Sequence, residues 1–368
     1  MSKVEENNSK LLIFSFQDPY QASNIVEAKE AEVRGYDWIA WGERNNYPEY
    51  LLDLFRNVPA LQSIINGCVD YTCGDDIAIA NQFAVRVNTK DETINQLVRM
   101  ISFDWWTYGA FALNIIRNKA GEVSDIYYLN VKDVRSDKKN ERFFYSSDWS
   151  KSWGRIKYVE YPKFDINGKD ASSILYVKNN WNNTYGTPVY GAATKAAELM
   201  KSIDEYQLNA INNGFMASYI ISLNNGTPTP EVQAEIEKEL NEKFSGYENA
   251  GRIMLAFNKS KDNEVTVQKL EQPDFDKKYE ALKNWSQQQL FTSFRANPAL
   301  FGLPQENTGF NDQDYQQAFK LFNRTMILPV QRIIADAFKN IFGAEVLTIK
   351  PFNIDWTEDS TENNTIID

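Results

Sequence analysis

Apolar and polar positions repeat along this chain with two periods, and each period predicts its own kind of element. In the first half, apolar residues three or four positions apart predict short helices, two of which begin at prolines, where a missing N–H is tolerated. Alternating patterns between turn-forming residues predict strands. The predicted elements are helices from Pro48, from Pro59 and over 93–108, and strands at 11–16, 110–117, 123–129, 143–145, 156–161 and 174–177. This half is therefore expected to form an α+β lobe.

Long helical patterns dominate the second half of the chain. Helices are predicted over 189–211, 275–294 and 311–342, and a final strand is predicted at 346–349. The expected buried stripe of the first consists of Ala192, Ala196, Leu199, Ile203, Tyr206 and Ala210. Pro329 lies inside the third pattern and predicts a kink, because proline lacks the N–H that would continue the helix. A small αβ module is predicted between the first two helices, with strands at 217–223, 251–257 and 265–270 and a helix over 230–244.

The loop between the second and third long helices has an unusual composition. Pro298, Gly302 and Pro304 disfavour helix and precede a small polar tip. The tip residues are Gln305, Glu306, Asn307, Thr308 and Gly309. From the residues alone, two interpretations remain open: an ordinary interhelical turn, or a surface whose amide and hydroxyl groups make weak polar contacts.

Composition excludes several classes of function. The chain has 368 residues, of which 50 are acidic and 39 basic, so its net charge of −11 disfavours a protein that grips duplex DNA by neutralising phosphates. The absence of histidine excludes Ser-His-Asp and Cys-His catalysis and every histidine-containing metal site. No phosphate-binding loop of the Walker type is present, so ATP hydrolysis is not expected. Neither a membrane helix nor a secretory signal is found, and the protein is expected to remain in the cytoplasm that made it.

A few short motifs have a simple structural interpretation beside a functional one. Cys68 and Cys73 are too few for a four-thiolate zinc site and are expected to be buried and reduced. The run 74–76, Gly-Asp-Asp, matches the core of a polymerase metal motif, but no other carboxylate pattern supports it, and a helix-ending turn is expected. Trp105 and Trp106 would suit base stacking, yet their place on an amphipathic pattern favours core packing.

Five segments, in this order along the chain, resemble the portal protein family of tailed double-stranded DNA phages. The first is WGERNNYP at 41–48, and the second is YGAFALNIIRNKAGEV at 108–123. The third is YGTP at 185–188, which opens a long helix, and the fourth is ENAGR at 248–252 before an apolar strand. The fifth is 294–329, which contains the polar loop. Each motif is weak alone. Five motifs in the family's order, over roughly residues 35–345, argue against a chance match.

The resemblance implies an α+β portal fold with a defined division of the chain. The expected parts are an N-terminal arm (1–34), an α+β wing (35–188), a stem helix (189–214), a small αβ clip (215–271), a second stem helix (272–297), an interhelical tunnel loop (298–311), a long kinked helix with the C-terminal part of the wing (312–355), and a disordered tail (356–368). A helical crown, which many portals carry, would be reduced or absent here.

The resemblance also implies a structural, non-catalytic function without metal or cofactor. The chain would form a homo-oligomeric ring, a dodecamer in the family, at one capsid vertex of the virion, after assembly in the host bacterial cytoplasm. Double-stranded DNA would pass through its channel during packaging and ejection. Its expected partners are the large subunit of terminase, the major capsid protein or scaffold, and the head-completion or neck proteins. An acidic channel wall would repel phosphate and let DNA slide.

Two groups of residues are candidates for these contacts. The tip of the tunnel loop, Gln305, Glu306, Asn307 and Thr308, would face DNA. The acidic face of the predicted clip helix, Glu231, Glu235, Glu239 and Glu242, would dock basic partners such as the motor, although a merely solvated face is the simpler interpretation. Two other classes of function stay open: another head-tail connector, neck or tail protein, and a hydrolase that uses paired carboxylates.

Overall fold

The structure is a computed structural model of the whole chain. It describes residues 11–13, 26–80, 82–151, 153–180, 182–212, 219–223, 229, 232, 253–257, 275–302 and 312–352. The chain divides into two units. The large unit consists of Ile25–Glu198 with Trp285–Asp368, and the small unit of Met1–Asn24 with Leu199–Asn284.

The large unit contains three helices near its start: α1 (Tyr47–Asn57), α2 (Pro59–Cys73) and α3 (Ile94–Tyr108). Pro48 and Pro59 occupy the first turns of α1 and α2, as the sequence predicts. Thr93 and Gln96 form a capping box at the start of α3. Gly109 ends α3 with a φ of 75°, a conformation that favours glycine. Local capping therefore explains why the predicted bounds of these helices are confirmed.

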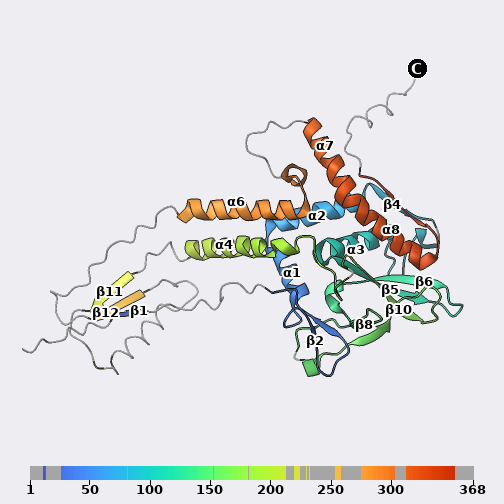
Figure 1. Cartoon of the computed structure of the whole chain (residues 1–368), viewed down its shortest axis with the longest axis horizontal. Coiled ribbons are helices and arrows are strands. Elements are labelled where there is room, and N and C mark those ends of the chain that lie inside the picture. The colour runs from blue at the N-terminus through green and yellow to red at the C-terminus, as the bar shows by residue number, and fades with distance from the viewer. Residues whose placement is uncertain are drawn as a thin grey trace, which may run out of the picture. The chain divides into compact units, whose positions relative to one another are not determined.

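A three-stranded antiparallel sheet packs against α3 (Figure 1). Its strands are β5 (Ala110–Arg117), β6 (Val123–Leu129) and β10 (Ser172–Lys178), in the order β10-β5-β6. A second sheet consists of β7 (Val134–Ser136), β8 (Arg142–Tyr145) and β9 (Val159–Pro162). The central strand β5 is almost wholly buried, whereas β6 is mostly half-buried. The predicted α+β lobe is thus confirmed, with β5 at its core.

Two short strand pairings were not predicted, although the strand expected at 346–349 is confirmed with a shift of one residue. The strand β4 (Asp76–Ile79) pairs antiparallel with β13 (Leu347–Lys350). Gly74 ends α2 with a φ of 66°, and a Cβ added there would meet the carbonyl oxygen of Lys350 at 2.0 Å. The run 74–76 therefore forms the predicted helix-ending turn, and it leads directly into a strand. Cys68 and Cys73 are both free and buried, as expected.

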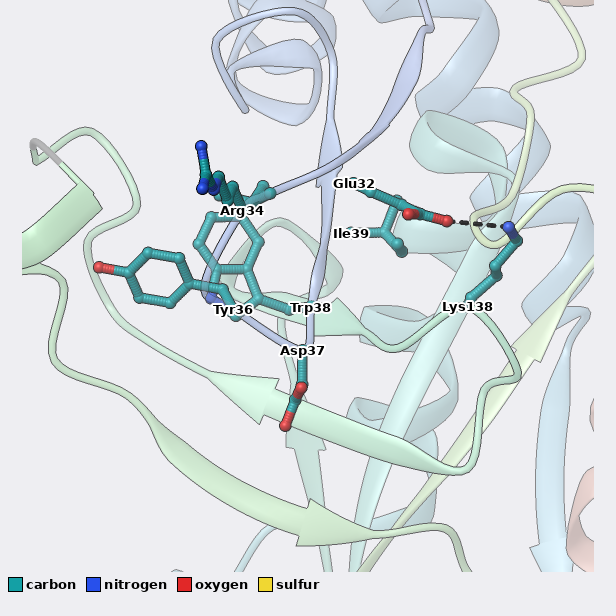
Figure 2. Close-up of a pocket in the computed structure, with 8 residues that line it drawn as sticks. Glu32, Arg34, Tyr36, Asp37, Trp38, Ile39 and Lys138 are labelled. Carbon is teal, nitrogen blue, oxygen red and sulfur yellow. Dashed lines mark hydrogen bonds and ion pairs between the residues drawn. The ribbon is translucent and has the colours of Figure 1, made fainter.

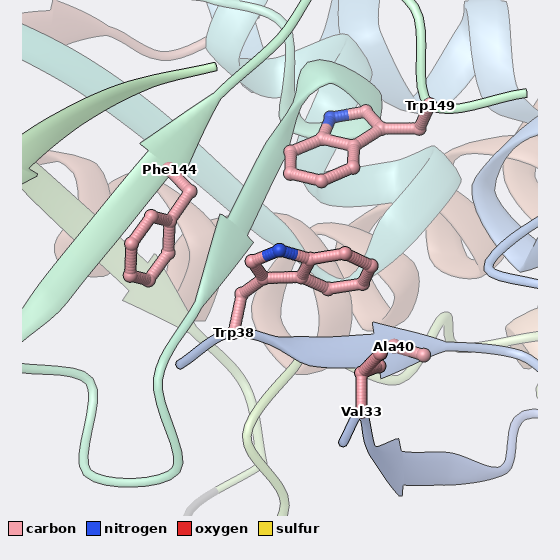
Figure 3. Close-up of a cluster of buried hydrophobic side chains, with 5 residues drawn as sticks. All are labelled: Val33, Trp38, Ala40, Phe144 and Trp149. Atoms are coloured by element: carbon pink, nitrogen blue, oxygen red, sulfur yellow. The ribbon is translucent and has the colours of Figure 1, made fainter. Parts of the chain in front are cut away.

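The second pair is the hairpin of β2 (Glu30–Glu32) and β3 (Ile39–Trp41). It covers a small hydrophobic cluster of Val33, Trp38, Ala40, Phe144 and Trp149 (Figure 3). The rings of Trp38 and Trp149 meet edge to face, with centroids 5.0 Å apart. Residues 26–34, which the sequence assigns to an N-terminal arm, belong to this hairpin and to the large unit.

The long helices α4 (Thr194–Asn212) and α6 (Phe275–Phe294) lie side by side and antiparallel (Figure 1). Within the small unit, Lys283 Nζ of α6 lies 2.6 Å from the Asp204 carboxylate of α4. The rings of Tyr206 and Tyr279 lie 5.1 Å apart. The bounds predicted for α6 are confirmed.

The start and the buried stripe predicted for α4 need correction. A 3₁₀ turn, Gly191–Ala193, precedes the helix, because the Tyr190 hydroxyl donates to the Thr107 carbonyl and holds this segment against α3. Ala192 is exposed and Tyr206 is half exposed, whereas Ala193 and Met200 are buried. Ala196 and Ile203 of the predicted stripe are buried as expected, and Leu199 is half-buried, so the prediction is confirmed in part.

The third long helical pattern forms α7 (Asp312–Phe322) and α8 (Leu328–Phe342), joined by a π-helical segment, Asn323–Ile327. The Leu328 N–H donates to the Asn323 carbonyl, five residues back rather than four. Pro329, in the first turn of α8, has no N–H for the carbonyl four residues before it. The predicted interruption is therefore present, as a widened turn just before the proline.

The small unit contains a three-stranded sheet of β1 (Leu11–Ile13), β12 (Ile253–Phe257) and β11 (Tyr219–Leu223), in that order. The strand β12 pairs in parallel with β11 and antiparallel with β1. The strands predicted at 217–223 and 251–257 are confirmed, with slightly shorter bounds. The strand predicted at 265–270 and the helix predicted over 230–244 lie outside the described residues.

Candidate functional site: the anchored interhelical loop

The candidate contact residues from the sequence lie outside the described part of the chain. They are Gln305, Glu306, Asn307 and Thr308 in the loop, and Glu231, Glu235, Glu239 and Glu242 in the clip. The structure does describe both ends of the loop. One end is the 3₁₀ turn η6 (Pro298–Phe301) after α6, and the other is the start of α7.

The turn η6 is built by the residues that disfavour helix. The Asn297 side chain accepts a hydrogen bond from the Ala299 N–H at 3.0 Å, and Pro298 occupies the first position of the turn. Gly302 ends it with a φ of 76°, and its N–H donates to the Pro298 carbonyl. The residues in front of the loop tip therefore form a capped turn at the end of α6.

Two hydroxyl groups fix this turn to helix α2. The Tyr71 hydroxyl donates to the Leu300 carbonyl at 2.8 Å, and the Ser63 hydroxyl donates to the Phe301 carbonyl at 3.0 Å. Burial raises the pKa of Tyr71 well above its usual value, so the hydroxyl remains a proton donor over the whole physiological range. The carbonyls at the end of η6 are thus satisfied by side chains that lie more than 200 residues earlier in the chain.

Aromatic packing ties the far end of the loop to the same residue. The ring of Tyr71 contacts Phe301 of η6, with centroids 6.0 Å apart, and Phe319 of α7, at 5.2 Å. The rings of Phe301 and Phe322 meet edge to face at 5.7 Å. A Cβ at Gly67 would lie 2.7 Å from the Phe301 ring, so α2 must carry glycine there. Both ends of the loop therefore rest on α2.

The segment 41–48 forms a buried structural site around a single arginine. Arg135 is only 1% exposed, and its Nε donates to Asn45 Oδ1 at 2.5 Å. Its other nitrogens donate to the carbonyls of Asn45, Lys132 and Val134 at 2.8 to 3.1 Å. The guanidinium also lies 4.9 Å from the centre of the Trp149 ring. Burial lowers the pKa of Arg135 to about 10, so it remains charged at neutral pH while it holds three loops together.

The segment 185–188 approaches the end of α3 very closely. A Cβ at Gly186 would meet the Gly109 carbonyl oxygen at 2.3 Å, and one at Gly109 would meet the Thr187 carbonyl oxygen at 2.2 Å. The Tyr185 ring stacks on Trp41, with centroids 4.5 Å apart, and its hydroxyl donates to the Ile39 carbonyl. Tyr185 and Gly186 therefore fix the hairpin of β2 and β3, and the entry to α4, against the end of α3.

One carboxyl group of the large unit is completely buried. Asp104 of α3 accepts hydrogen bonds from the Tyr128 hydroxyl at 3.0 Å and from the Val131 N–H at 2.9 Å. Burial raises the pKa of Asp104 to about 8, and these two hydrogen bonds oppose the shift. Among the described residues, no group of three or more His, Cys, Asp or Glu side chains is placed to hold a metal ion.

The β2–β3 hairpin also borders an open surface pocket of about 500 Å³ (Figure 2). Its lining residues are Glu32, Val33, Arg34, Tyr36, Asp37, Trp38, Ile39 and Lys138. The Lys138 ammonium lies 2.8 Å from the Glu32 carboxylate, and both side chains are largely exposed. An exposed pair of this kind contributes little binding or catalytic power. The loop anchorage is therefore the better candidate for function.

The comparison with protein families decides the identity of the fold. The model of the family described as "Phage portal protein" matches residues 79–358, which is more than half of the chain. The chain belongs to the phage portal protein family. The expected α+β portal fold is thereby confirmed, and so is the expectation of a structural, non-catalytic protein, because the family is not one of enzymes.

Portal and neck structures share this fold at low sequence identity. A chain from the neck of a native gene transfer agent particle, computed with C12 symmetry, is 18% identical and has a TM-score of 0.53, over 84% of this chain and 86% of that one. An HK97-family phage portal protein from Corynebacterium diphtheriae is 11% identical, with a TM-score of 0.51, over 82% and 93% of the two chains.

The curated relatives carry no functional description. An uncharacterised protein of Rickettsia bellii is 28% identical over 193 residues, which are 51% of this chain and 48% of that protein. The matches thus span about half the length of these relatives. Among the described residues of this portal family member, no helix has the length and apolarity to cross a membrane.

Several residues that position the loop or the segment 41–48 were not found from the sequence. Tyr71, Ser63 and Arg135 occupy ordinary positions in their own segments, and their partners lie 90 to 238 residues away. The only local signals were indirect: Gly67 beside the apolar face of α2, and an arginine in a short apolar strand. The turn formed by Pro298 and Gly302 was visible in the sequence, whereas the surface that receives it was not.

Proposed function

We propose that this chain assembles into a ring at one vertex of a phage capsid and forms the channel through which double-stranded DNA enters and leaves. The observation that carries the proposal is the family match over residues 79–358. A neighbour of the same fold comes from a particle neck computed with C12 symmetry. The ring would place the protein in the virion, and twelve copies is the number we expect. The chain itself would hydrolyse nothing, and a separate terminase would supply the force.

The exposed apolar side chains of the small unit fit a ring of packed helices. Tyr206 and Leu208 of α4 are 49% and 58% exposed, and Leu282 of α6 is also exposed. The ion pair between Lys283 and Asp204 holds α4 and α6 together within one copy. Apolar side chains left exposed on these two helices gain stability when a neighbouring copy covers them. We therefore assign these exposed side chains to the contacts between adjacent copies.

The anchored loop would lie at the channel wall. Its polar tip, Gln305 to Thr308, offers amides and a hydroxyl for brief contacts with phosphate, while Glu306 and the net charge of −11 disfavour tight binding. Because both ends of the loop rest on α2, the tip would hold its position while DNA moves past it. The acidic residues Glu235 and Glu239 would face the packaging terminase, and other surfaces would contact the capsid protein, scaffold and neck proteins.

Electron microscopy of the purified protein tests the ring directly. We expect closed rings with an axial opening. Leu208→Glu should prevent their formation, because a charge would be buried between copies. Val85→Glu is the matched control, since Val85 is 82% exposed in the large unit. Monomers alone, across salt and protein concentration, would contradict the proposal and would favour another head or tail component.

Two further variants test the contacts with DNA and the motor. Replacing residues 305–308 by Gly-Ser should reduce the DNA that is packaged or retained in particles, without loss of rings. Charge reversal by Glu235→Lys and Glu239→Lys should weaken binding of the terminase. Unchanged packaging in the first variant, or unchanged terminase affinity in the second, rejects the corresponding role.

A further inference from the structure

The N-terminal strand covers one edge of the sheet in the small unit. Leu11, Leu12 and Ile13 of β1 pair antiparallel with Ala256, Leu255 and Met254 of β12. The strand β11 occupies the opposite edge of β12 (Figure 1). Ile221 of β11 lies directly across from Leu255. We call the side of β12 that receives β1 the acceptor edge.

The acceptor edge needs a strand. Among the described strands, only β11 would remain beside β12 without β1, and a two-stranded sheet is at best marginally stable in water. The exposed edge of β12, whose sequence is Ile-Met-Leu-Ala-Phe, would also present a row of unpaired backbone groups to other chains. The segment Leu11–Ile13 is therefore part of this sheet, although the sequence places it in an arm that precedes the rest of the fold.

The chain that follows β1 is long enough to serve another copy. Twelve residues, 14–25, separate Ile13 from Val26, the first described residue of the large unit. A segment of this length reaches up to about 40 Å when fully extended. Packed helices of adjacent copies in a ring would lie only about 10 Å apart. The extended length of this segment thus exceeds the spacing between packed helices of neighbouring copies.

We propose that β1 is exchanged between neighbours in the assembled ring, so that the acceptor edge of each copy receives Leu11–Ile13 of a second copy of this chain. The inference rests on the proposed ring. The same backbone hydrogen bonds form in either arrangement, so the exchange costs little, and it converts a strand pair within one chain into a link between two. In a closed ring, every acceptor edge is filled and every copy is tied to the next.

Disulfide cross-linking of the full-length ring tests the exchange. Leu12→Cys and Leu255→Cys place two thiols on directly opposed positions of β1 and β12, where side chains are close enough to bond after oxidation. Burial raises the pKa of both native thiols, Cys68 and Cys73, so they oxidise slowly and can remain. Exchange predicts a shift from monomer to a ladder of covalent multimers on a non-reducing gel, and the reductant should reverse it.

The matched control keeps Leu12→Cys and moves the second thiol to Ile221→Cys. Ile221 lies on β11, two strands from β1, which is roughly 9–10 Å and too far for a disulfide. This variant should stay monomeric on the gel. A second pair, Ile13→Cys with Met254→Cys, repeats the test at the next register position in case the first pair impairs folding.

The outcomes separate the exchange from the ring itself. Rings in the microscope together with the ladder support the exchange. Rings with only internally bonded monomers show that each copy keeps its own strand, and they overturn the exchange while the proposed function stands. Rings in which neither pair forms a bond overturn it as well, since β1 is then not on the acceptor edge. The absence of rings removes the proposed function and the exchange together.

Discussion

The buried carboxyl group of Asp104 should make the stability of the protein depend on pH in an unusual direction. An aspartate in an unfolded chain has a pKa near 3.9. In the folded protein, burial raises the pKa of Asp104 to about 8. Between these values the unfolded chain has lost this proton and the folded protein has kept it. Because the unfolded state binds fewer protons, the free energy of unfolding falls as pH rises through this range.

The size of the effect follows from the separation of the two pKa values. Each pH unit inside the window changes the free energy of unfolding by about 1.4 kcal/mol for one proton. From pH 5.5 to 7.5, the titration of Asp104 should therefore lower the free energy of unfolding by about 2.7 kcal/mol. Asp104→Asn removes the titrating group and keeps an oxygen that can accept from the Val131 N–H. Between pH 5.5 and 7.5, the free energy of unfolding of the variant should therefore rise by about that amount relative to the wild type.

The window is favourable for the measurement, since the chain has no histidine to titrate within it. Urea unfolding would be followed by the fluorescence of the nine tryptophans at several pH values and one protomer concentration. Asp91→Asn, at an exposed carboxylate, is the control and should leave a constant difference from the wild type. If the difference between Asp104→Asn and the wild type is also constant with pH, the argument from burial is wrong.

Three other substitutions test the packing that positions the loop and the wing. Tyr71→Phe keeps the ring and removes only the hydroxyl that binds η6, so urea unfolding should show a loss of about 1 kcal/mol. Arg135→Lys cannot reproduce the forked donors of the buried guanidinium and should cost about 2–4 kcal/mol by the same measurement; a loss below 1 kcal/mol would contradict its structural role. Gly74→Ala forces a Cβ against a β13 carbonyl and should lower the melting temperature far more than Gly121→Ala, which has a similar positive φ but open space.

The sequence predicted the parts of the fold that local interactions determine. The helix α3 was found because Thr93, Gln96 and Gly109 mark its two ends within the chain itself. The hairpin of β5 and β6 was found because the turn between them is short. By contrast, β4 and β13 are four residues each and pair with residues about 270 positions away, and no local pattern marks such a pair. The start of α4 was misplaced for the same reason: a contact from Tyr190 to α3 overrides the local helical pattern.

In the candidate site, too, local features could be predicted and long-range contacts could not. The turn before the loop tip was visible because Pro298 and Gly302 each restrict the backbone in a recognisable way. Its attachment to α2 was not visible, because Tyr71 looks like any aromatic residue on a buried helix face until the partner carbonyl is placed beside it. The assignment of Gln305 to Thr308 to DNA contact, and of the clip glutamates to docking, remains a prediction.

The segments that carry the family resemblance share a structural task. Asn45 in the first segment receives the buried Arg135, and Gly109 and Gly186 allow two backbones to approach within a distance that no Cβ permits. Pro298 begins the turn that Tyr71 binds. Each of these residues serves close contact within the large unit, and none of them is a residue that we assign to DNA or to the motor. Where these segments are described, their residues therefore serve the packing of the large unit, including the turn at the start of the loop.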